Sequence, residues 1–281
     1  MVYAASPISS ASSPGATCRD EAVIAHVLIL WGVIAVAAAL GVVVHRRRTP
    51  DEAPEYQSAL TFVGAAYGLL LGLLVVFAVG HYTDVRHEAQ AEASTLVALQ
   101  DTVRIYPSET SDPVRHDVVC YMRSIVHDEW PSMERGKDTP ARRTLGFGDR
   151  VRADVRNLPS GDPMQGSAYG RANSLITDAS QSRQRLLFFT EPRIPAALWV
   201  VIYVGAFLVF FLLVGHYATR PAGRAVALGS VALLMTVVVS VLATLDQPFG
   251  VGARVHPEEM TQAIELVLTG EKSPAILAPC R

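Results

Sequence analysis

Four uninterrupted apolar stretches constrain this chain more than any other feature. They are AVIAHVLILWGVIAVAAALGVVV (Ala22–Val44), ALTFVGAAYGLLLGLLVVFAVG (Ala59–Gly80), PAALWVVIYVGAFLVFFLLVG (Pro195–Gly215) and AVALGSVALLMTVVVSVLATL (Ala225–Leu245). Each has the length, about 20 residues, that a helix needs to cross roughly 30 Å of hydrocarbon. None contains Asp, Glu, Lys or Arg. The sequence therefore predicts an all-α integral membrane protein with four transmembrane helices in two hairpins, whose first partner is the lipid bilayer.

These spans divide the chain into five parts. Residues 1–21 are rich in Ser, Ala and Pro and form a tail that we expect to be disordered. Residues 22–80 form the first transmembrane hairpin, 81–194 an extramembrane domain, 195–245 the second hairpin, and 246–281 a C-terminal turn and short helix. The tail has no basic segment before the first span, so we do not expect that span to be a cleaved signal peptide.

The short connections between spans predict the orientation. Residues 45–58 contain Arg46, Arg47 and Arg48, and residues 216–224 contain Arg220 and Arg224. Short basic loops remain in the cytoplasm. The extramembrane domain and both termini are then expected on the extracytoplasmic side of a cell membrane.

This orientation would place all three cysteines, Cys18, Cys120 and Cys280, where disulfides can form. A bridge between Cys120 and Cys280 is one alternative, and unpaired cysteines are the other. None of the three has the spacing of a metal site.

The extramembrane domain is expected to be helical. A heptad seam continues from the second span without interruption, so this span should extend as a stalk helix until Pro107. The seam consists of Tyr82, Val85, Ala89, Glu92, Leu96, Leu99, Val103 and Tyr106. Further helices are expected from Asp112-Pro113 to Pro131, within Pro140–Asn157, and from Asp162-Pro163 toward the third span. Pro257 and two glutamates open a last short helix.

Composition excludes several functions. The formal net charge is −2, which gives no general attraction to nucleic acid. The chain has no phosphate-binding loop, HExxH motif or nucleophile elbow, so we expect neither an enzyme nor a cofactor. Asp128 and Glu129 are adjacent on a helix and face different ways, which argues against a catalytic pair.

Four segments together resemble the bacterial bestrophin-like family. They are ALTFVGAAYGLLLGLLVVFAVGHYTDVRHEAQAEASTLVALQD, VHDEWPSM, RQRLLFFTEPRIPAALWVVIYVGAF and TLDQPFGVGARVHPEEM, in this order. The resemblance implies kinship to bestrophins, which are pentameric anion channels with four spans per subunit. Two features differ: Gln247 stands where the family has an arginine, and bestrophins keep their helical domain in the cytoplasm. The charge rule predicts the opposite side here.

Glu92 is the first candidate functional residue because it is a carboxylate in an apolar seam, which is costly unless paired or hydrated. One alternative is a pore-lining group, reached when several subunits bring their stalks together. The other is an ion pair with Arg183 or Arg185. A ring of Glu92 carboxylates would attract cations rather than anions.

Two further ionisable residues lie at the ends of spans. His26 lies about one turn inside the first span, where an ionisable group is a functional candidate, although a neutral imidazole near the interface costs little. Asp246 ends the fourth span. It either binds an ion at a pore mouth, caps the turn at Pro248, or pairs with an arginine.

Small residues in the spans predict close helix packing. Gly64, Gly68 and Gly72 recur at every fourth position of the second span, and Gly205 lies in the third. The ridge packs either within the chain or between subunits of a homo-oligomer. Two functions remain open: an oligomeric, bestrophin-like ion channel, and a non-conducting membrane-anchored helical module that senses a signal or binds an envelope partner.

Overall fold

The structure is a computed structural model that describes residues 14–46, 56–135, 137, 139–190, 194–216, 221–246, 249 and 255–280. This part of the chain is helical and contains no strand, which confirms the all-α class. The elements are α1 (Pro14–Arg46), α2 (Tyr56–Val103), α3 (Ser108–Ser124), the π-helical turn η1 (Ile125–Glu129), α4 (Trp130–Glu134), α5 (Arg142–Arg156), α6 (Pro163–Phe188), α7 (Ala196–His216), α8 (Pro221–Leu245) and α9 (Glu258–Leu268).

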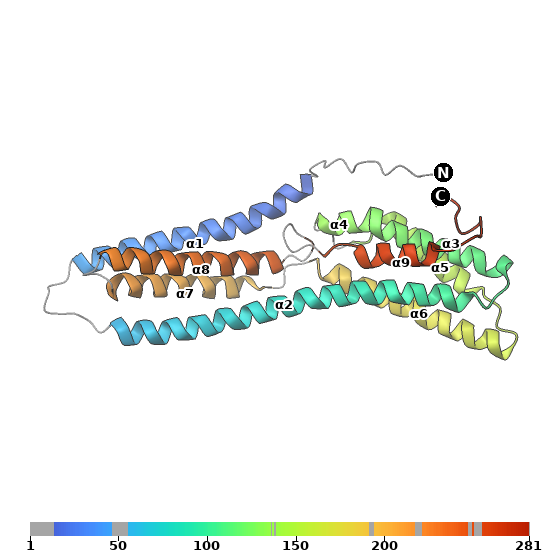
Figure 1. Cartoon of the computed structure of the whole chain (residues 1–281), viewed down its shortest axis with the longest axis horizontal. Coiled ribbons are helices and arrows are strands. Elements are labelled where there is room, and N and C mark those ends of the chain that lie inside the picture. Colours follow the sequence, from blue (N-terminus) through green and yellow to red (C-terminus); the bar gives the residue numbers. More distant parts are fainter. Residues whose placement is uncertain are drawn as a thin grey trace.

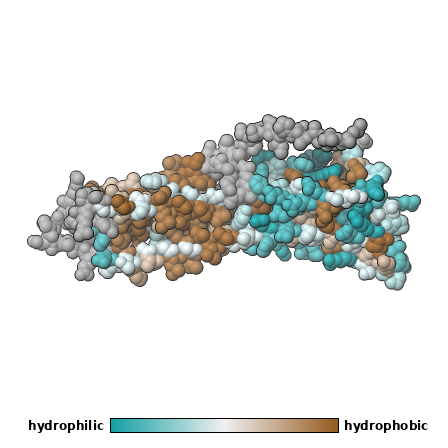
Figure 2. All heavy atoms as spheres, in the orientation of Figure 1, coloured by the Kyte–Doolittle hydropathy of each residue, from teal (hydrophilic) through white to brown (hydrophobic). Residues whose placement is uncertain are grey.

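The molecule is elongated and has two chemically different ends (Figure 1). At one end α1, the first half of α2, α7 and α8 form a bundle whose outer surface is apolar (Figure 2). Among the described residues, four helices are long and apolar enough to cross a membrane: Val23–Val44, a part of Gln57–Val103, Ala196–His216 and Ala225–Leu245. The four predicted spans are thus confirmed.

Helix α2 joins the two ends. Its 48 residues correspond to about 72 Å at 1.5 Å per residue, more than twice the hydrocarbon thickness. Its first half therefore crosses the membrane, and its second half stands outside as the predicted stalk. The seam of this stalk is buried, with Val85, Leu96, Leu99 and Val103 all at 0% exposure. It packs against α6, which runs alongside (Figure 1).

Two predicted helix starts are wrong. Helix α1 begins at Pro14, so residues 14–21 of the predicted tail belong to it, while residues 1–13 lie outside the described part. Helix α3 begins at Ser108 rather than at Asp112. The amides of Thr110 and Ser111 both donate to the Pro107 carbonyl at 2.9 Å, so the helix is established before Pro113 removes one bond.

Pro131 does not end the second extramembrane helix, as the sequence had predicted. It lies in the first turn of α4, directly after the π-helical turn η1. Proline lacks an N–H and its ring collides with the carbonyl four residues back. The wider turn of a π-helix avoids this collision, because the Trp130 amide bonds to the Ile125 carbonyl. The chain thus stays helical through the proline.

The C-terminal segment closes the extramembrane core. The indole of Trp130 donates to the Val255 carbonyl at 3.0 Å and contacts the Phe249 ring edge-on. Helix α9 buries Met260, Ala263 and Val267. Trp130 thereby anchors the segment after α8 to η1 and α4.

Candidate functional site

Two buried carboxylates share one arginine in the extramembrane core. Arg183 on α6 donates from Nε to Glu129 Oε1 at 2.8 Å and from Nη1 to Glu92 Oε2 at 3.4 Å. The hydroxyl of Tyr121 donates to Glu92 Oε1 at 3.4 Å. Both glutamates have 0% exposure and Arg183 has 5%. This group, called here the carboxylate–arginine cluster, joins the stalk, α3, η1 and α6.

The π-helical turn explains how Glu129 reaches the cluster. Asp128 and Glu129 are adjacent in η1, yet Asp128 lies near Arg143 at the surface and Glu129 is fully buried. The turn that accommodates Pro131 widens the helix at this point and sets the direction of Glu129. The sequence did not predict this contact. The available signal was a proline two residues after a glutamate within an otherwise helical pattern.

The charges in the cluster do not balance, since two carboxylates face one guanidinium. Burial raises the pKa of Glu92 to about 7; Arg183 opposes this shift and the nearby Glu129 adds to it. Burial also raises the pKa of the Tyr121 hydroxyl. Burial alone would lower the pKa of Arg183, but the two carboxylates outweigh it and raise that pKa. The cluster can therefore hold one proton near neutral pH.

A cavity of about 150 Å³ lies beside this cluster. Tyr121, Glu129, Arg152 and Arg183 contribute to its lining. Within the described part of the chain, Glu129 Oε2 has no hydrogen-bond partner. The cavity offers room and an acceptor for water or another small polar molecule.

The structure favours the ion-pair alternative for Glu92. Its carboxylate lies inside the core of one chain, where a neighbouring subunit would not reach it. Its arginine is Arg183, whereas Arg185 pairs with Glu88 at 2.8 Å at the surface.

His26 lies in an aromatic group inside the membrane bundle. Its ring stacks on Trp199 with centroids 3.8 Å apart, and its Nδ1 lies 2.6 Å from the Tyr203 hydroxyl. Both partners come from α7, one turn apart. This contact connects the first and third spans, and gives the polar ring a partner within the hydrocarbon region.

Asp246 connects the two ends of the second hairpin. Its side chain is buried and accepts a hydrogen bond from the Ile194 amide at 2.8 Å. Asp246 thus gives the Ile194 amide, which lies just before α7, a hydrogen-bond acceptor. Gln247 and Pro248, which bear on the capping alternative and on the family difference, lie outside the described residues.

The glycines of the spans fall into two groups. A Cβ placed on Gly205 would lie 2.3 Å from the Tyr67 ring, so only glycine allows Tyr67 to lie across α7. The Tyr67 hydroxyl then donates to the Ile202 carbonyl at 2.7 Å. By contrast, a Cβ on Gly64, Gly68 or Gly72 meets no atom within 4 Å. The described part of this chain leaves that ridge uncovered.

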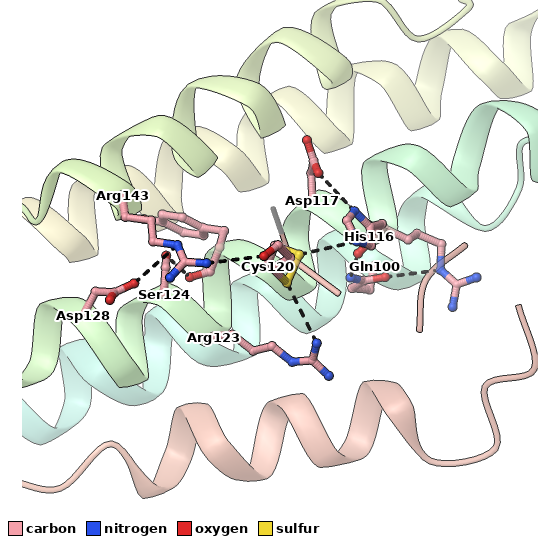
Figure 3. Close-up of a disulfide and its surroundings, with 11 residues drawn as sticks. Gln100, His116, Asp117, Cys120, Arg123, Ser124, Asp128 and Arg143 are labelled. Carbon is pink, nitrogen blue, oxygen red and sulfur yellow. Dashed lines mark hydrogen bonds and ion pairs between the residues drawn. A yellow bond between two sulfur atoms is a disulfide. The ribbon is translucent and has the colours of Figure 1, made fainter. Parts of the chain in front are cut away.

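Cys120 on α3 and Cys280 in the C-terminal segment form a disulfide (Figure 3). Their Cα atoms are 5.5 Å apart. The side chain of Cys18 lies outside the described part.

Comparisons with known proteins agree with this architecture. The family model of the Bestrophin-like domain matches residues 26–260. A bacterial bestrophin homologue from Klebsiella pneumoniae has a similar structure, with a TM-score of 0.66 at 14% sequence identity over 88% of this chain and 99% of that one. A variant of that homologue gives a TM-score of 0.65 at 13% identity over 88% and 98%. A search of curated proteins found no match. The family match covers most of the chain, and the described helices have the same fold as the homologue, so this integral membrane protein belongs to the bestrophin-like family.

Proposed function

We propose that the chain assembles with further copies of itself into an ion channel across a bacterial inner membrane. The uncovered ridge of Gly64, Gly68 and Gly72 carries this proposal. Small residues at every fourth position allow two membrane helices to approach closely. Because the described part of the chain does not fill this ridge, a helix of a second copy is the occupant that fits it.

The family relationship supports the activity. Bestrophins are oligomeric ion channels, and the homologue from Klebsiella pneumoniae is similar to this chain over nearly its whole length. A channel needs a path through the assembly rather than through one subunit. The bundle of a single chain is filled by apolar side chains such as Leu30, Ile202, Phe210 and Leu242, all at 0% exposure, so the path would lie between copies.

The uncovered surface of α2 indicates how such a path would be controlled. It exposes large apolar side chains, among them Phe62, Leu69, Leu73 and Val76. A constriction lined by such groups closes by expelling water. Glu92 lies inside the extramembrane core and would not select the ion.

The second candidate is a non-conducting module, and one observation favours it. The hydroxyls of Thr61, Thr236 and Ser240 donate to carbonyls four residues back in their own helices. These hydroxyls already donate within their own helices, so their hydrogens do not point toward a passing ion. A module of this kind would use its helical domain to sense a signal or to bind an envelope partner.

Flux measurements on reconstituted protein separate the two candidates. Wild type in liposomes should pass chloride or potassium and behave as an oligomer by native mass spectrometry. Gly68→Leu fills the ridge and should reduce both oligomer and flux. Gly229→Leu is the matched control, because Gly229 is exposed in α8 and also has no atom within 4 Å of an added Cβ. A wild-type oligomer without flux would favour the non-conducting module, and a monomer without flux would remove the channel.

We further propose that the extramembrane domain faces outward. The arginines of the two short loops support this side. The Cys120–Cys280 disulfide supports it independently, since disulfides persist in oxidising compartments. A phosphatase that folds only outside the cytoplasm, fused after residue 281, should be active. An inactive phosphatase together with a fluorescent cytoplasmic reporter at the same position would reverse the orientation.

A further inference from the structure

A histidine lies directly against the disulfide. His116 and Cys120 are four residues apart and therefore neighbours on one face of α3, and the disulfide holds Cys280 of the C-terminal segment at the same place. One Nδ1 or Nε2 atom of His116 and the two sulfur atoms all lie within 4.8 Å of one another. Two thiol ligands and one imidazole are thus gathered from parts of the chain that are 160 residues apart.

The histidine ring has the orientation of a metal ligand. Its Nδ1 lies 3.2 Å from Asp117 Oδ1, and its Nε2 lies 3.5 Å from Cys120 Sγ (Figure 3). Metal-binding histidines usually direct the second ring nitrogen to a carboxylate or carbonyl, which fixes the tautomer. Asp117 occupies that position and leaves Nε2 on the side of the sulfurs.

The distances suit zinc. With Zn–S bonds of about 2.3 Å and Zn–N bonds of about 2.0 Å, tetrahedral angles place a sulfur and a nitrogen ligand about 3.5 Å apart. This value equals the observed distance between Cys120 Sγ and His116 Nε2. In the reduced site the two sulfurs need to lie about 3.8 Å apart.

We propose that reduction of the disulfide turns this place into a site for a thiophilic divalent cation, with Zn²⁺ as the best fit. Cys120, Cys280 and His116 are its three protein ligands, and water takes the fourth position. Three protein ligands with one open position are common in zinc sites. The oxidised chain holds the disulfide and no metal, and the reduced chain holds the metal.

Contacts other than the disulfide keep Cys280 in place. Arg115 forms an ion pair with Glu271, and the Ser273 hydroxyl donates to Asp112 at 2.6 Å. Ile276 is fully buried against α3 and α9. These three contacts lie within the ten residues before Cys280, so its thiol stays beside α3 when the S–S bond breaks.

The surroundings suit two thiolates and a divalent cation. The charges of two thiolates and Zn²⁺ cancel, and nearby Asp117 and Asp128 balance Arg123 and Arg143. Arg123 Nη1 lies 3.8 Å from Cys280 Sγ. A pocket of about 290 Å³ lined by both cysteines and Arg123 gives small molecules access.

A dithiol reduces the S–S bond by supplying two electrons and two protons, and itself becomes a disulfide. A phosphine supplies the two electrons and becomes a phosphine oxide, while water supplies the oxygen and the two protons. In both cases each cysteine sulfur becomes a thiol. Binding of Zn²⁺ then forms two Zn–S bonds and releases two protons. In reverse, a small-molecule disulfide takes two electrons from the thiolates and becomes two thiols, the S–S bond of the protein forms again, and Zn²⁺ leaves.

Metal titration of the full chain in detergent tests this inference. The protein carries Cys18→Ser, so that only two thiols remain, and is reduced with a phosphine and then desalted without oxygen. Added Co²⁺ should give sulfur-to-metal charge-transfer absorption at one ion per chain, and Zn²⁺ should displace it. Zn²⁺ should also raise the Tm of the reduced protein and leave that of the oxidised protein unchanged.

Three variants make the test specific. His116→Gln should weaken Zn²⁺ binding at least about tenfold, and Asp117→Asn about 10- to 100-fold. His127→Gln is the matched control, since His127 lines the same pocket but is not among the three ligands. Absence of the charge-transfer band from the reduced protein, or equal affinity in His116→Gln and His127→Gln, would overturn the proposal. Either result is independent of whether the protein conducts ions.

Discussion

The guanidinium of Arg183 lies 2.6 Å from the Glu129 carboxylate, and the two residues come from α6 and from the π-helical turn of η1. Neither side chain is exposed by more than 7%. The same guanidinium also reaches Glu92 on the stalk. One cation therefore holds together three elements of the extramembrane domain, in a region where an unpaired charge is costly.

Replacement of Arg183 by methionine should strongly destabilise the extramembrane domain. Arg183→Met leaves two buried carboxylates without a cation, and breaking a buried pair in this way costs about 3–5 kcal/mol. Thermal unfolding of the purified protein, followed by the fluorescence of its tryptophans, should show a large decrease in Tm. Arg185→Met is the matched control, because Arg185 pairs with Glu88 at the surface and is 60% exposed. Equal decreases in the two variants would contradict the role assigned to Arg183.

Stability should fall as the pH rises toward neutrality because of Glu92. Its pKa is about 7 in the folded protein and 4.5 for the ordinary group, so between these values the folded state binds more protons than the unfolded state. The contribution of Glu92 to the free energy of unfolding therefore decreases from about pH 4.5 to about pH 7 and stays level above that pH. The difference of the two pKa values corresponds to a change on the order of 3 kcal/mol.

Glu92→Gln should remove this part of the pH dependence, since glutamine does not titrate. The measurement is Tm against pH for wild type and variant in one detergent. A wild-type Tm that is level between about pH 5 and about pH 7 would show that Glu92 does not titrate in this range. Glu88→Gln is a control from the same helix, because Glu88 lies at the surface with Arg185.

The spans were predictable because a helix that crosses the hydrocarbon region needs about 20 consecutive apolar residues, and such stretches are visible directly in the sequence. The stalk seam was equally clear, since Val85, Leu96, Leu99 and Val103 repeat at the spacing of a packed helix. Proline positions were less informative. Pro131 remains inside a helix because a π-helical turn precedes it, and whether that turn forms depends on contacts such as Glu129 with Arg183.

Contacts between distant segments were the harder part of the candidate site. The sequence presented Arg183 and Arg185 as equal partners for Glu92, and only the rotation of α6 about its axis separates them. His26 was visible as a lone polar group, but Trp199 and Tyr203 lie about 175 residues away and follow from the packing of α1 on α7. The sequence showed the Gly64–Gly68–Gly72 ridge, but whether another helix of the same chain covers it depends on how the four spans pack.

Alanine at Gly205 should disturb the membrane bundle. The added Cβ would lie 2.3 Å from the Tyr67 ring, so α2 and α7 must separate or Tyr67 must move and lose its bond to the Ile202 carbonyl. Overpacking of this kind costs about 1–3 kcal/mol. Gly229→Ala is the control in α8, where an added Cβ meets no atom within 4 Å. The Tm in detergent should fall for Gly205→Ala only, and a similar fall in both variants would show that glycine itself, rather than the Tyr67 contact, is what matters.

Removal of the disulfide should lower stability without releasing the C-terminal segment. The bridge closes a loop of 160 residues, for which the chain-entropy estimate is about 5 kcal/mol and measured losses are about 2–5 kcal/mol. Cys280→Ser should therefore decrease the Tm of the oxidised protein, whereas Cys18→Ser should not. Limited proteolysis should still find the residues after α9 protected, because the Arg115–Glu271 pair and Ile276 hold them against α3. Rapid cleavage after Lys272 in Cys280→Ser, with the rest of the chain intact, would show instead that the disulfide alone fastens this segment.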